Sequence, residues 1–453
     1  MVSRSKNLAV AVVAAASLCT LAACSSGTSP APSSGGGTSS SAGTGGSGAL
    51  KGTSFTILGQ WTGGEQKAFQ AVIDAFDQQT GATGQYTPAA GGNEAGVLGT
   101  KVAGGTPPDI AILSLPGAIA QYAGSNKIFP VSAATQQVVE QNFASEWGKL
   151  GSYKGKMYCV PVDASDKSTV WYNATLFKNA GLTDTPTTWE GLIKDAKTLS
   201  ASGVKVPISV GGGDGWTLTD WFENVYLRTA GVDKYDALTQ HQIKWTDPTV
   251  TKALETLKQV WGDPQLIGSP AAAVKVPFPA SVDNVFKANP TSAIVYEASF
   301  VATTITGDKD PSPVGTVAKV FPFPSIDGSQ PVVEAAGDFG CAFTQNPAAE
   351  QFLAYLAGPE AATTLVSTQG SGFLSVNKNV KASAYNDATS AQLAEQMVKV
   401  GDNFRFDMSD QTPAAFGGTP NKGEWAALQT FLTTGNVKAT QEQLEKDATA
   451  AYK

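Results

Sequence analysis

Short apolar strands alternate with amphipathic helices from Thr53 to the C-terminus, and this alternation restricts the fold more than any other feature. The run at 53–58 is typical of a strand. A helix is predicted from Glu65 to about Thr80, because its apolar residues recur at helical spacing and Gly81 suits its end. Further strands are predicted at 110–113, 206–210 and 292–296, and helices dominate from Pro347 onward. The pattern predicts an α/β protein.

The first 24 residues have the features of a secretory signal: Arg4 and Lys6, an apolar run from Leu8 to Leu18, then Leu-Ala-Ala before Cys24. The run is too short for a permanent span of a bilayer core of roughly 30 Å. Leu-Ala-Ala-Cys resembles a bacterial lipobox, which implies that Cys24 becomes the lipid-carrying first mature residue. An ordinary secreted protein with an incidental Cys24 is the alternative.

Residues 25–49 contain only Ser, Gly, Thr, Pro and Ala. Such a segment buries too little apolar surface to offset its ordering entropy, so we expect a disordered tether. A flexible linker of this length has an end-to-end distance of roughly 25–30 Å. A mucin-like glycosylated stretch would give the same geometry. The folded body is therefore expected at 50–453.

The charge and histidine content exclude several function classes. Without Arg4 and Lys6 the chain has 29 basic and 38 acidic residues, which argues against nucleic acid as a partner. His241 is the single histidine, so a Ser-His-Asp or Cys-His mechanism lacks a suitable base and a His-rich metal site is excluded. We expect no catalytic residue, no metal and no cofactor.

Cys159 and Cys341 remain once Cys19 and Cys24 are assigned to the leader. An even pair in an oxidising compartment favours a disulfide. Two buried free thiols are the alternative, and the sequence does not decide between them.

Candidate ligand-binding residues follow the predicted strands, because ligands of open α/β sheets bind outside the carboxyl ends of strands. Carboxylates, amides and aromatic rings predominate there, and this combination suits a sugar: rings stack on its C–H faces and carboxylates bond its hydroxyls. Trp171, Trp245 and Trp261 suit the core, whereas Trp61 and Trp216 lie next to glycines at strand-to-helix turns. The candidates are Gln60, Trp61, Glu65, Asp163, Asp214, Trp216, Tyr296, Glu297 and Asp338.

Several motifs occur in a characteristic order. They are Trp-Thr-Gly-Gly-Glu at 61–65, the helix at 69–81, Gly-Thr-Pro-Pro-Asp-Ile at 105–110, Ser-Thr-Val-Trp-Tyr-Asn at 168–173 and Thr-Thr-Trp-Glu-Gly-Leu at 187–192. Together they resemble the extracellular solute-binding proteins of carbohydrate ABC transporters, the large class similar to maltose-binding protein. The resemblance covers 50–453, and segments 162–167 and 213–221 resemble the branch often assigned to α-glucosides.

The resemblance implies a two-lobed, type II periplasmic-binding-protein-like clamshell with an interlobe hinge, crossed near Asp163 and again near Lys319. It adds Asp109 to the first lobe's wall. It also implies a sugar or oligosaccharide ligand, permease subunits as membrane partners, a lipid anchor on the outer face of the cytoplasmic membrane, and a monomer. The segment 89–94 departs from the family, so the contact made there is left open.

Two other functions remain open. A lipid-anchored glycoside hydrolase would also use carboxylates in an aromatic cleft. A receptor for a non-sugar solute, such as a peptide or a polyamine, is the second alternative.

Overall fold

The computed structural model describes residues 50–89, 94–307 and 314–453. The predicted leader at 1–24 with Cys24 and the predicted tether at 25–49 lie outside these residues. None of the helices within the described ranges combines the length and the apolarity that a membrane span requires.

The helix that follows the first strand shows how the local sequence sets the fold. It begins at Gly63 and ends at Thr80, and Gly81 closes it in the left-handed conformation with φ 77°. Phe69, Val72, Ile73 and Phe76 are all buried, as their spacing predicts. This apolar face is part of the first of four clusters of buried apolar side chains in the described residues, and the two large clusters are called the first and second core below.

The first core is formed mainly by residues 50–164 and 335–376. Its five-stranded sheet has the order β2-β1-β3-β13-β6, with β1 parallel to β2 and β3 and with β13 antiparallel to β3 and β6. The strands are β1 (Ser54–Gly59), β2 (Thr83–Pro88), β3 (Ile110–Leu113), β6 (Cys159–Pro161) and β13 (Phe339–Ala342), with a hairpin of β4 (Ser152–Tyr153) and β5 (Lys156–Met157). The helices are α1 (Gly63–Thr80), α2 (Glu94–Ala103), α3 (Pro116–Gly124), α4 (Ala133–Asn142), α5 (Ser145–Leu150), α15 (Pro347–Leu356) and α16 (Pro359–Ser367), followed by η2 (Ala382–Ala384) and α17 (Ala388–Val400).

The second core combines residues 170–326 with residues 408–448. Its four-stranded sheet has the order β11-β8-β10-β9. The strands are β8 (Thr169–Asn173), β9 (Ile208–Ser209), β10 (Ile294–Tyr296) and β11 (Ala318–Pro322). The helices are α6 (Ala174–Asn179), α7 (Trp189–Ala201), α8 (Trp216–Ala230), α9 (Val232–Thr239), α10 (Pro248–Trp261), α11 (Pro264–Ile267), α12 (Pro270–Ala273), α13 (Phe278–Phe286), α14 (Val301–Gly307), α18 (Met408–Gln411), α19 (Ala414–Gly417), α20 (Gly423–Thr434) and α21 (Val437–Ala451).

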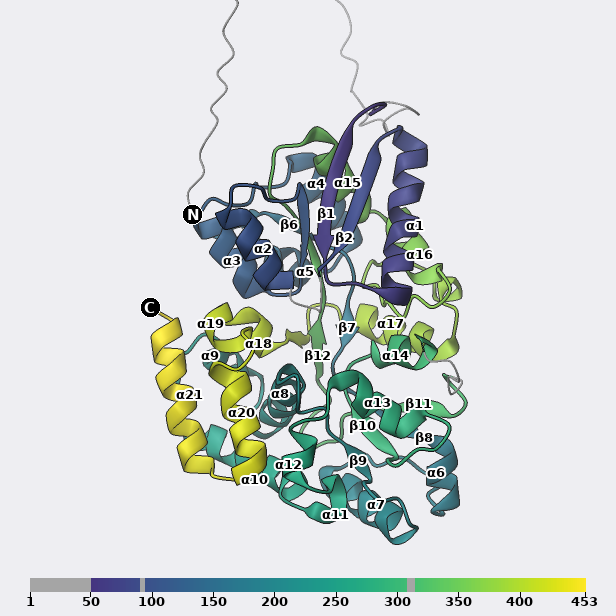
Figure 1. Cartoon of the computed structure of the whole chain (residues 1–453), viewed down its shortest axis with the longest axis vertical. Coiled ribbons are helices and arrows are strands. Elements are labelled where there is room, and N and C mark those ends of the chain that lie inside the picture. The colour runs from purple at the N-terminus through teal and green to yellow at the C-terminus, as the bar shows by residue number, and fades with distance from the viewer. Residues whose placement is uncertain (1–49, 90–93, 308–313) are drawn as a thin grey trace, which may run out of the picture. The chain divides into compact units, whose positions relative to one another are not determined.

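A small third sheet joins the two lobes that these cores define (Figure 1). It consists of β7 (Ser165–Asp166), β12 (Val333–Ala336) and β14 (Phe404–Phe406). The predicted crossing near Asp163 is confirmed. The predicted crossing near Lys319 is wrong: Lys319 pairs with Tyr172 inside the second sheet, and the chain crosses at β12 and again at β14.

Cys159 and Cys341 form a disulfide. They are paired residues on neighbouring antiparallel strands, β6 and β13, with their Cα atoms 4.4 Å apart, and both are fully buried. The bond therefore links segments separated by 182 residues in the chain.

Replacing both cysteines with serine is expected to lower the free energy of unfolding by about 2–4 kcal/mol, because the long loop becomes unconstrained in the unfolded chain. Urea denaturation of the double variant measures this loss, and wild-type protein unfolded with a thiol reductant serves as the matched control. Equal midpoints for the oxidised and reduced wild type would contradict the prediction.

Candidate functional site

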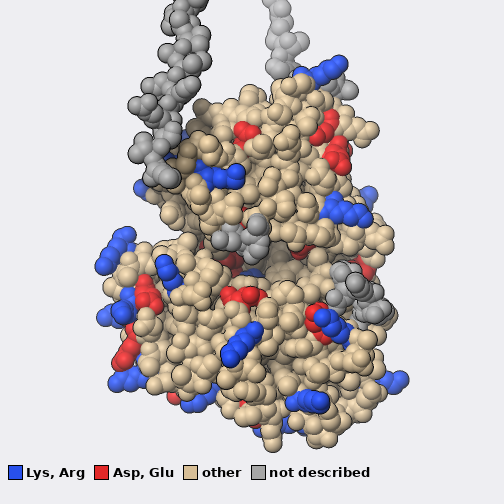
Figure 2. All heavy atoms as spheres, in the orientation of Figure 1, with Lys and Arg blue, Asp and Glu red and all other residues tan. Residues whose placement is uncertain are grey.

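The small third sheet that joins the lobes is called the hinge below. A cavity of about 800 Å³ lies beside it, with walls from both lobes. The first lobe and the hinge contribute mainly polar groups, including Gln60, Glu65, Glu94, Asp163, Lys167 and Asp338, and the second lobe contributes Trp216, Asp220, Phe300, Asp410 and Trp425. Figure 2 shows acidic side chains inside the hollow. The volume is that of a small-molecule site.

Asp338 organises the first lobe's wall. Gln60 Nε2 and Trp61 Nε1 donate to its two carboxylate oxygens at 2.8 and 3.2 Å, and its own backbone N–H donates to Asp163 Oδ1 at 2.7 Å. The turn between β12 and β13 brings Asp338 close to Asp163. A Cβ on Gly337 would lie 2.5 Å from the Asp163 carbonyl oxygen, so this approach requires glycine.

The carboxyl groups around Asp338 have pKa values above their ordinary values. Burial, followed by the charge of Asp338, raises the pKa of Glu65 to about 7 and that of Glu94 to about 8. Burial also raises the pKa of Asp338 to about 6, although hydrogen bonds from Gln60 and Trp61 act in the opposite direction. The wall therefore holds protons near neutral pH that ordinary carboxyl groups would have released.

These shifts predict the pH dependence of stability. Glu65 and Glu94 have an ordinary pKa of 4.5, so between that pH and about pH 7–8 the folded state binds more protons than the unfolded state. The free energy of unfolding should therefore fall as the pH rises through this window. Thermal melts of the unliganded protein measure the slope, and Glu94→Gln should flatten it. The same slope in wild type and variant would contradict the assignment.

Aromatic rings form the second lobe's wall. The Trp216 ring lies 5.1 Å from the Phe278 ring and 5.9 Å from the Phe300 ring. Gly215, with φ 85°, starts α8 and places Trp216 at its first position, and a Cβ on Gly215 would lie 2.9 Å from the Cβ of Trp425. The close approach of the turn at Gly215 to Trp425 therefore depends on a glycine.

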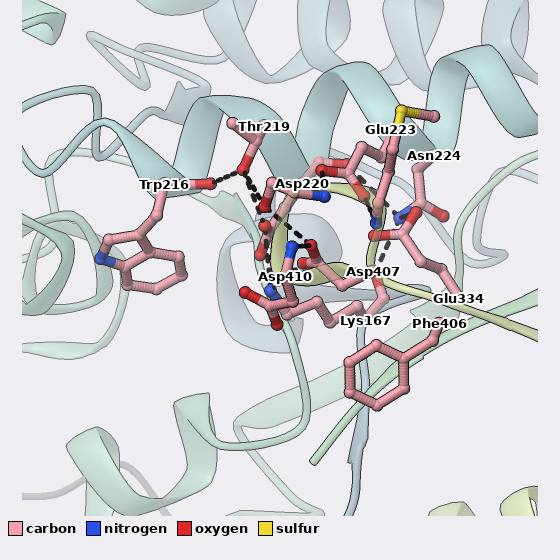
Figure 3. A network of polar contacts seen from close by, with 12 residues as sticks. Lys167, Trp216, Thr219, Asp220, Glu223, Asn224, Glu334, Phe406, Asp407 and Asp410 are labelled. Atoms are coloured by element: carbon pink, nitrogen blue, oxygen red, sulfur yellow. Dashed lines mark hydrogen bonds and ion pairs between the residues drawn. The ribbon is translucent and has the colours of Figure 1, made fainter. Parts of the chain in front are cut away.

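An ion network lies behind this wall (Figure 3). Lys167 Nζ is 3.0 Å from Asp220 Oδ1 and 2.5 Å from Asp407 Oδ2, and all three side chains are buried. Burial acts to raise the pKa of Asp407, but the Lys167 ammonium outweighs it and holds the pKa below its ordinary value. Lys167 Nζ also lies 5.8 Å from the centre of the Trp216 ring, so the network reaches the cavity.

Glu223, Glu334 and Asp407 meet in this network, with carboxylate oxygens within 4.8 Å of one another. Carboxylates so close together can hold a divalent cation. Here Asp407 pairs with Lys167, and Glu223 accepts hydrogen bonds from Ser409 N and Tyr235 Oη at 3.0 and 2.9 Å. Glu334 accepts a hydrogen bond from Asn224 Nδ2 at 2.7 Å, so each of the three carboxyl groups has a protein partner, and we assign the cluster no metal.

Six of the ten predicted ligand-binding residues line the cavity: Gln60, Trp61, Glu65, Asp163, Trp216 and Asp338. Trp61 differs from the expectation of an open stacking ring. It is only 3% exposed and packs against Phe69 and Phe373, with ring centres 4.8 and 5.0 Å away. Trp61 therefore belongs partly to the first core, as Trp171, Trp245 and Trp261 belong wholly to the core.

The structure places the other four predicted residues, Asp109, Asp214, Tyr296 and Glu297, away from the cavity lining. Asp109 precedes β3 and accepts hydrogen bonds from Thr56 N and Thr344 Oγ1. Asp214 accepts from Phe278 N.

Tyr296 is 1% exposed, and its hydroxyl donates to the Lys167 carbonyl at 2.7 Å. Glu297 is buried beside Asp220, and burial raises its pKa well above the ordinary value. Tyr296 is the last residue of β10 and Glu297 follows it, and both side chains are buried.

The sequence prediction missed Glu94, Lys167, Asp220, Phe300, Asp410 and Trp425, which also line the cavity. Glu94 falls in the segment at 89–94 whose role was left open. Lys167 lies in the segment where the sequence predicts a crossing between the lobes, and that position could have identified it as a cavity residue. Asp410 and Trp425 come from the helical C-terminal part, where no strand end marks a site.

Comparisons with known proteins agree on the family. The family model described as bacterial extracellular solute-binding protein matches residues 61–363. The chain is 30% identical over 384 residues to the alpha-glucosides-binding periplasmic protein AglE of Rhizobium meliloti, covering 81% of each chain. It is 31% identical to the osmoprotective compounds-binding protein GgtB of Synechocystis, covering 80% of this chain and 85% of that protein.

A solved structure of the bacterial solute receptor AcbH shares the fold. Its TM-score is 0.74 at 19% identity, and the match covers 88% of this chain and all of that one. The two-lobed α/β architecture predicted from the sequence is thus confirmed. The family match over residues 61–363 and the relatives matched over more than four fifths of their length establish that this chain belongs to the bacterial extracellular solute-binding proteins.

Proposed function

We propose that this protein is the substrate-binding component of a carbohydrate ABC importer that captures a sugar or short oligosaccharide, in particular an α-glucoside, in the hinge cavity. The observation that supports this proposal best is the cavity itself, which is lined by both carboxyl groups and aromatic rings. Rings stack on the C–H faces of a sugar, and carboxylates accept hydrogen bonds from its hydroxyls. The α-glucoside assignment is supported by the similarity to AglE.

The mechanism that we propose is a shift of population between open and closed lobes. A ligand that touches Glu65 on one lobe and Trp216 on the other makes both contacts only when the lobes are closed, so it favours closure. The closed form would then deliver the sugar to permease subunits. We further propose that the protein acts as a monomer on the outer face of the membrane, held by lipid on Cys24.

A thermal-shift panel of mono- and oligosaccharides tests this function. A ligand that binds only the native state raises stability by RT ln(1 + [L]/Kd), so a true ligand stands out at saturating concentration. Calorimetry on each hit should give one site per chain, and a sugar-release assay on the same sample should detect no products. Steady release of sugar would replace the proposal with the hydrolase, and a panel without any hit would refute sugar binding.

A further inference from the structure

Acidic side chains outnumber basic side chains on the described part of the cavity wall. Among the described residues that line the cavity, six are carboxylates and one is a lysine. The carboxylates are Glu65, Glu94, Asp163, Asp220, Asp338 and Asp410. Lys167 does not balance them, because its ammonium is already shared between Asp220 and the buried Asp407. Burial keeps several of these carboxyl groups protonated near neutral pH, so the described part of the wall holds acidic groups that a bound cation could ionise and no free cation of its own.

Two acidic oxygens on this wall, Glu94 Oε1 and Asp220 Oδ2, are buried and have no hydrogen-bond partner among the described residues. Glu94 is 8% exposed at the start of α2, and its Oε1 atom lacks a donor within the described residues. Asp338 nearby accepts hydrogen bonds from two neutral donors, Gln60 Nε2 and Trp61 Nε1. Burying a carboxyl oxygen without a hydrogen-bond partner costs free energy whether or not the group is ionised, so a ligand that donates a hydrogen bond to Glu94 is favoured here.

We propose that the ligand is a cationic saccharide, in which a sugar unit carries an ammonium group that binds between Glu94, Glu65 and Asp338. This inference rests on the proposed sugar-binding function and narrows its substrate class. An ammonium donates up to three hydrogen bonds and supplies the missing positive charge in one group. A hydroxyl donates a single hydrogen bond and leaves the charge of the wall unchanged.

The aromatic side chains of the second lobe's wall suit a cationic saccharide as well as they suit a neutral sugar. The Trp216 ring already has a cation near its face, since Lys167 Nζ lies 5.8 Å from the ring centre. Aromatic faces attract cations and also stack on sugar C–H groups. The raised pKa values of Glu65 and Glu94 arise from burial and from the nearby Asp338, and a bound ammonium would favour their ionised forms.

A matched ligand series tests the charge directly. Calorimetry would compare maltose, maltosamine and N-acetylmaltosamine in a neutral buffer, where the amine is largely protonated and the acidic side chains of the wall can still ionise. The amine should bind at least about tenfold more tightly than either neutral sugar, since one charge-assisted hydrogen bond accounts for that factor. N-acetylation keeps the nitrogen and removes the charge, so it separates charge from shape.

Two further measurements identify the site of the charge. Added salt should weaken maltosamine binding and leave maltose binding nearly constant, because salt screens charge interactions. Glu94→Gln should reduce the ratio of maltosamine to maltose affinity by several-fold. Glu255→Gln is the matched control, since Glu255 is an exposed residue of α10 away from the cavity, and it should leave the ratio unchanged.

The outcomes separate this inference from the proposed function. Equal binding of all three sugars would overturn the cationic ligand and leave the sugar-binding function intact. Binding of maltosamine alone would support both. If no saccharide binds, both fail, and selective binding of putrescine would show that the cavity recognises an amine without a sugar.

Discussion

Lys167→Met should destabilise the folded protein by about 3–5 kcal/mol, the cost of removing one partner of a buried ion pair. Lys167 is 7% exposed and is the cation that contacts both Asp220 and Asp407. Without it, two carboxylates that are almost completely buried would face each other and the nearby Glu334 with no countercharge (Figure 3). Urea denaturation of the unliganded protein measures the loss.

Lys252→Met provides the matched control for this experiment. Lys252 pairs with Asp327 at 3.1 Å, but both side chains are more than half exposed. An exposed pair contributes little, so this variant should lose less than about 1 kcal/mol. If Lys167→Met loses no more than the control, Asp220 and Asp407 must take up protons when the lysine is absent, and the network would not depend on its ion pair.

Trp216→Ala should lower the affinity for the sugar by about thirtyfold or more, because one large ring in a binding site commonly accounts for about 2 kcal/mol or more. Trp216 lines the cavity and is only partly buried, whereas its neighbours Phe278 and Phe300 retain their contact with each other at 5.5 Å. The melting temperature of the unliganded variant should therefore change little. Calorimetry with the best sugar from the panel measures the affinity.

Trp61→Ala is the informative comparison, because Trp61 also lines the cavity but lies in the first core. Truncating a buried tryptophan typically costs about 3–5 kcal/mol of stability. The two variants should therefore differ: Trp216→Ala loses affinity for the sugar and remains stable, whereas Trp61→Ala loses stability. Full affinity in Trp216→Ala would show that its ring does not contact the ligand.

Elements with strong local signals were predictable from the sequence. The periodicity of α1, its end at Gly81 and the strands β1 and β3 follow from short-range rules, and so does the α/β class. The rule that strand ends meet at one edge also led to Gln60, Trp61, Asp163 and Asp338, which the structure brings to one cavity.

The same rule does not predict in which direction a side chain at a strand end points, and this direction decides whether the residue lines the cavity or packs in the core. Tyr296 is the last residue of β10, but its ring packs on Trp221 at 4.8 Å inside the second core. Asp214 lies two residues before Trp216, yet it bonds to the start of α13 while Trp216 lines the cavity. Residues that are close in sequence can therefore differ in role, because a single turn of the backbone directs one side chain to the cavity and the next to the protein interior.

By itself the sequence determined which segments become strands and helices and that polar and aromatic groups follow the strands, since these depend on residues a few positions apart. Only the tertiary structure decided that Asp410 and Trp425, from the C-terminal helices, complete a cavity begun by Gln60 and Glu65. It also decided that Lys167 is held by Asp220 and Asp407. These contacts join residues tens to hundreds of positions apart, and they form only when the chain crosses the hinge three times and packs two cores against a shared sheet.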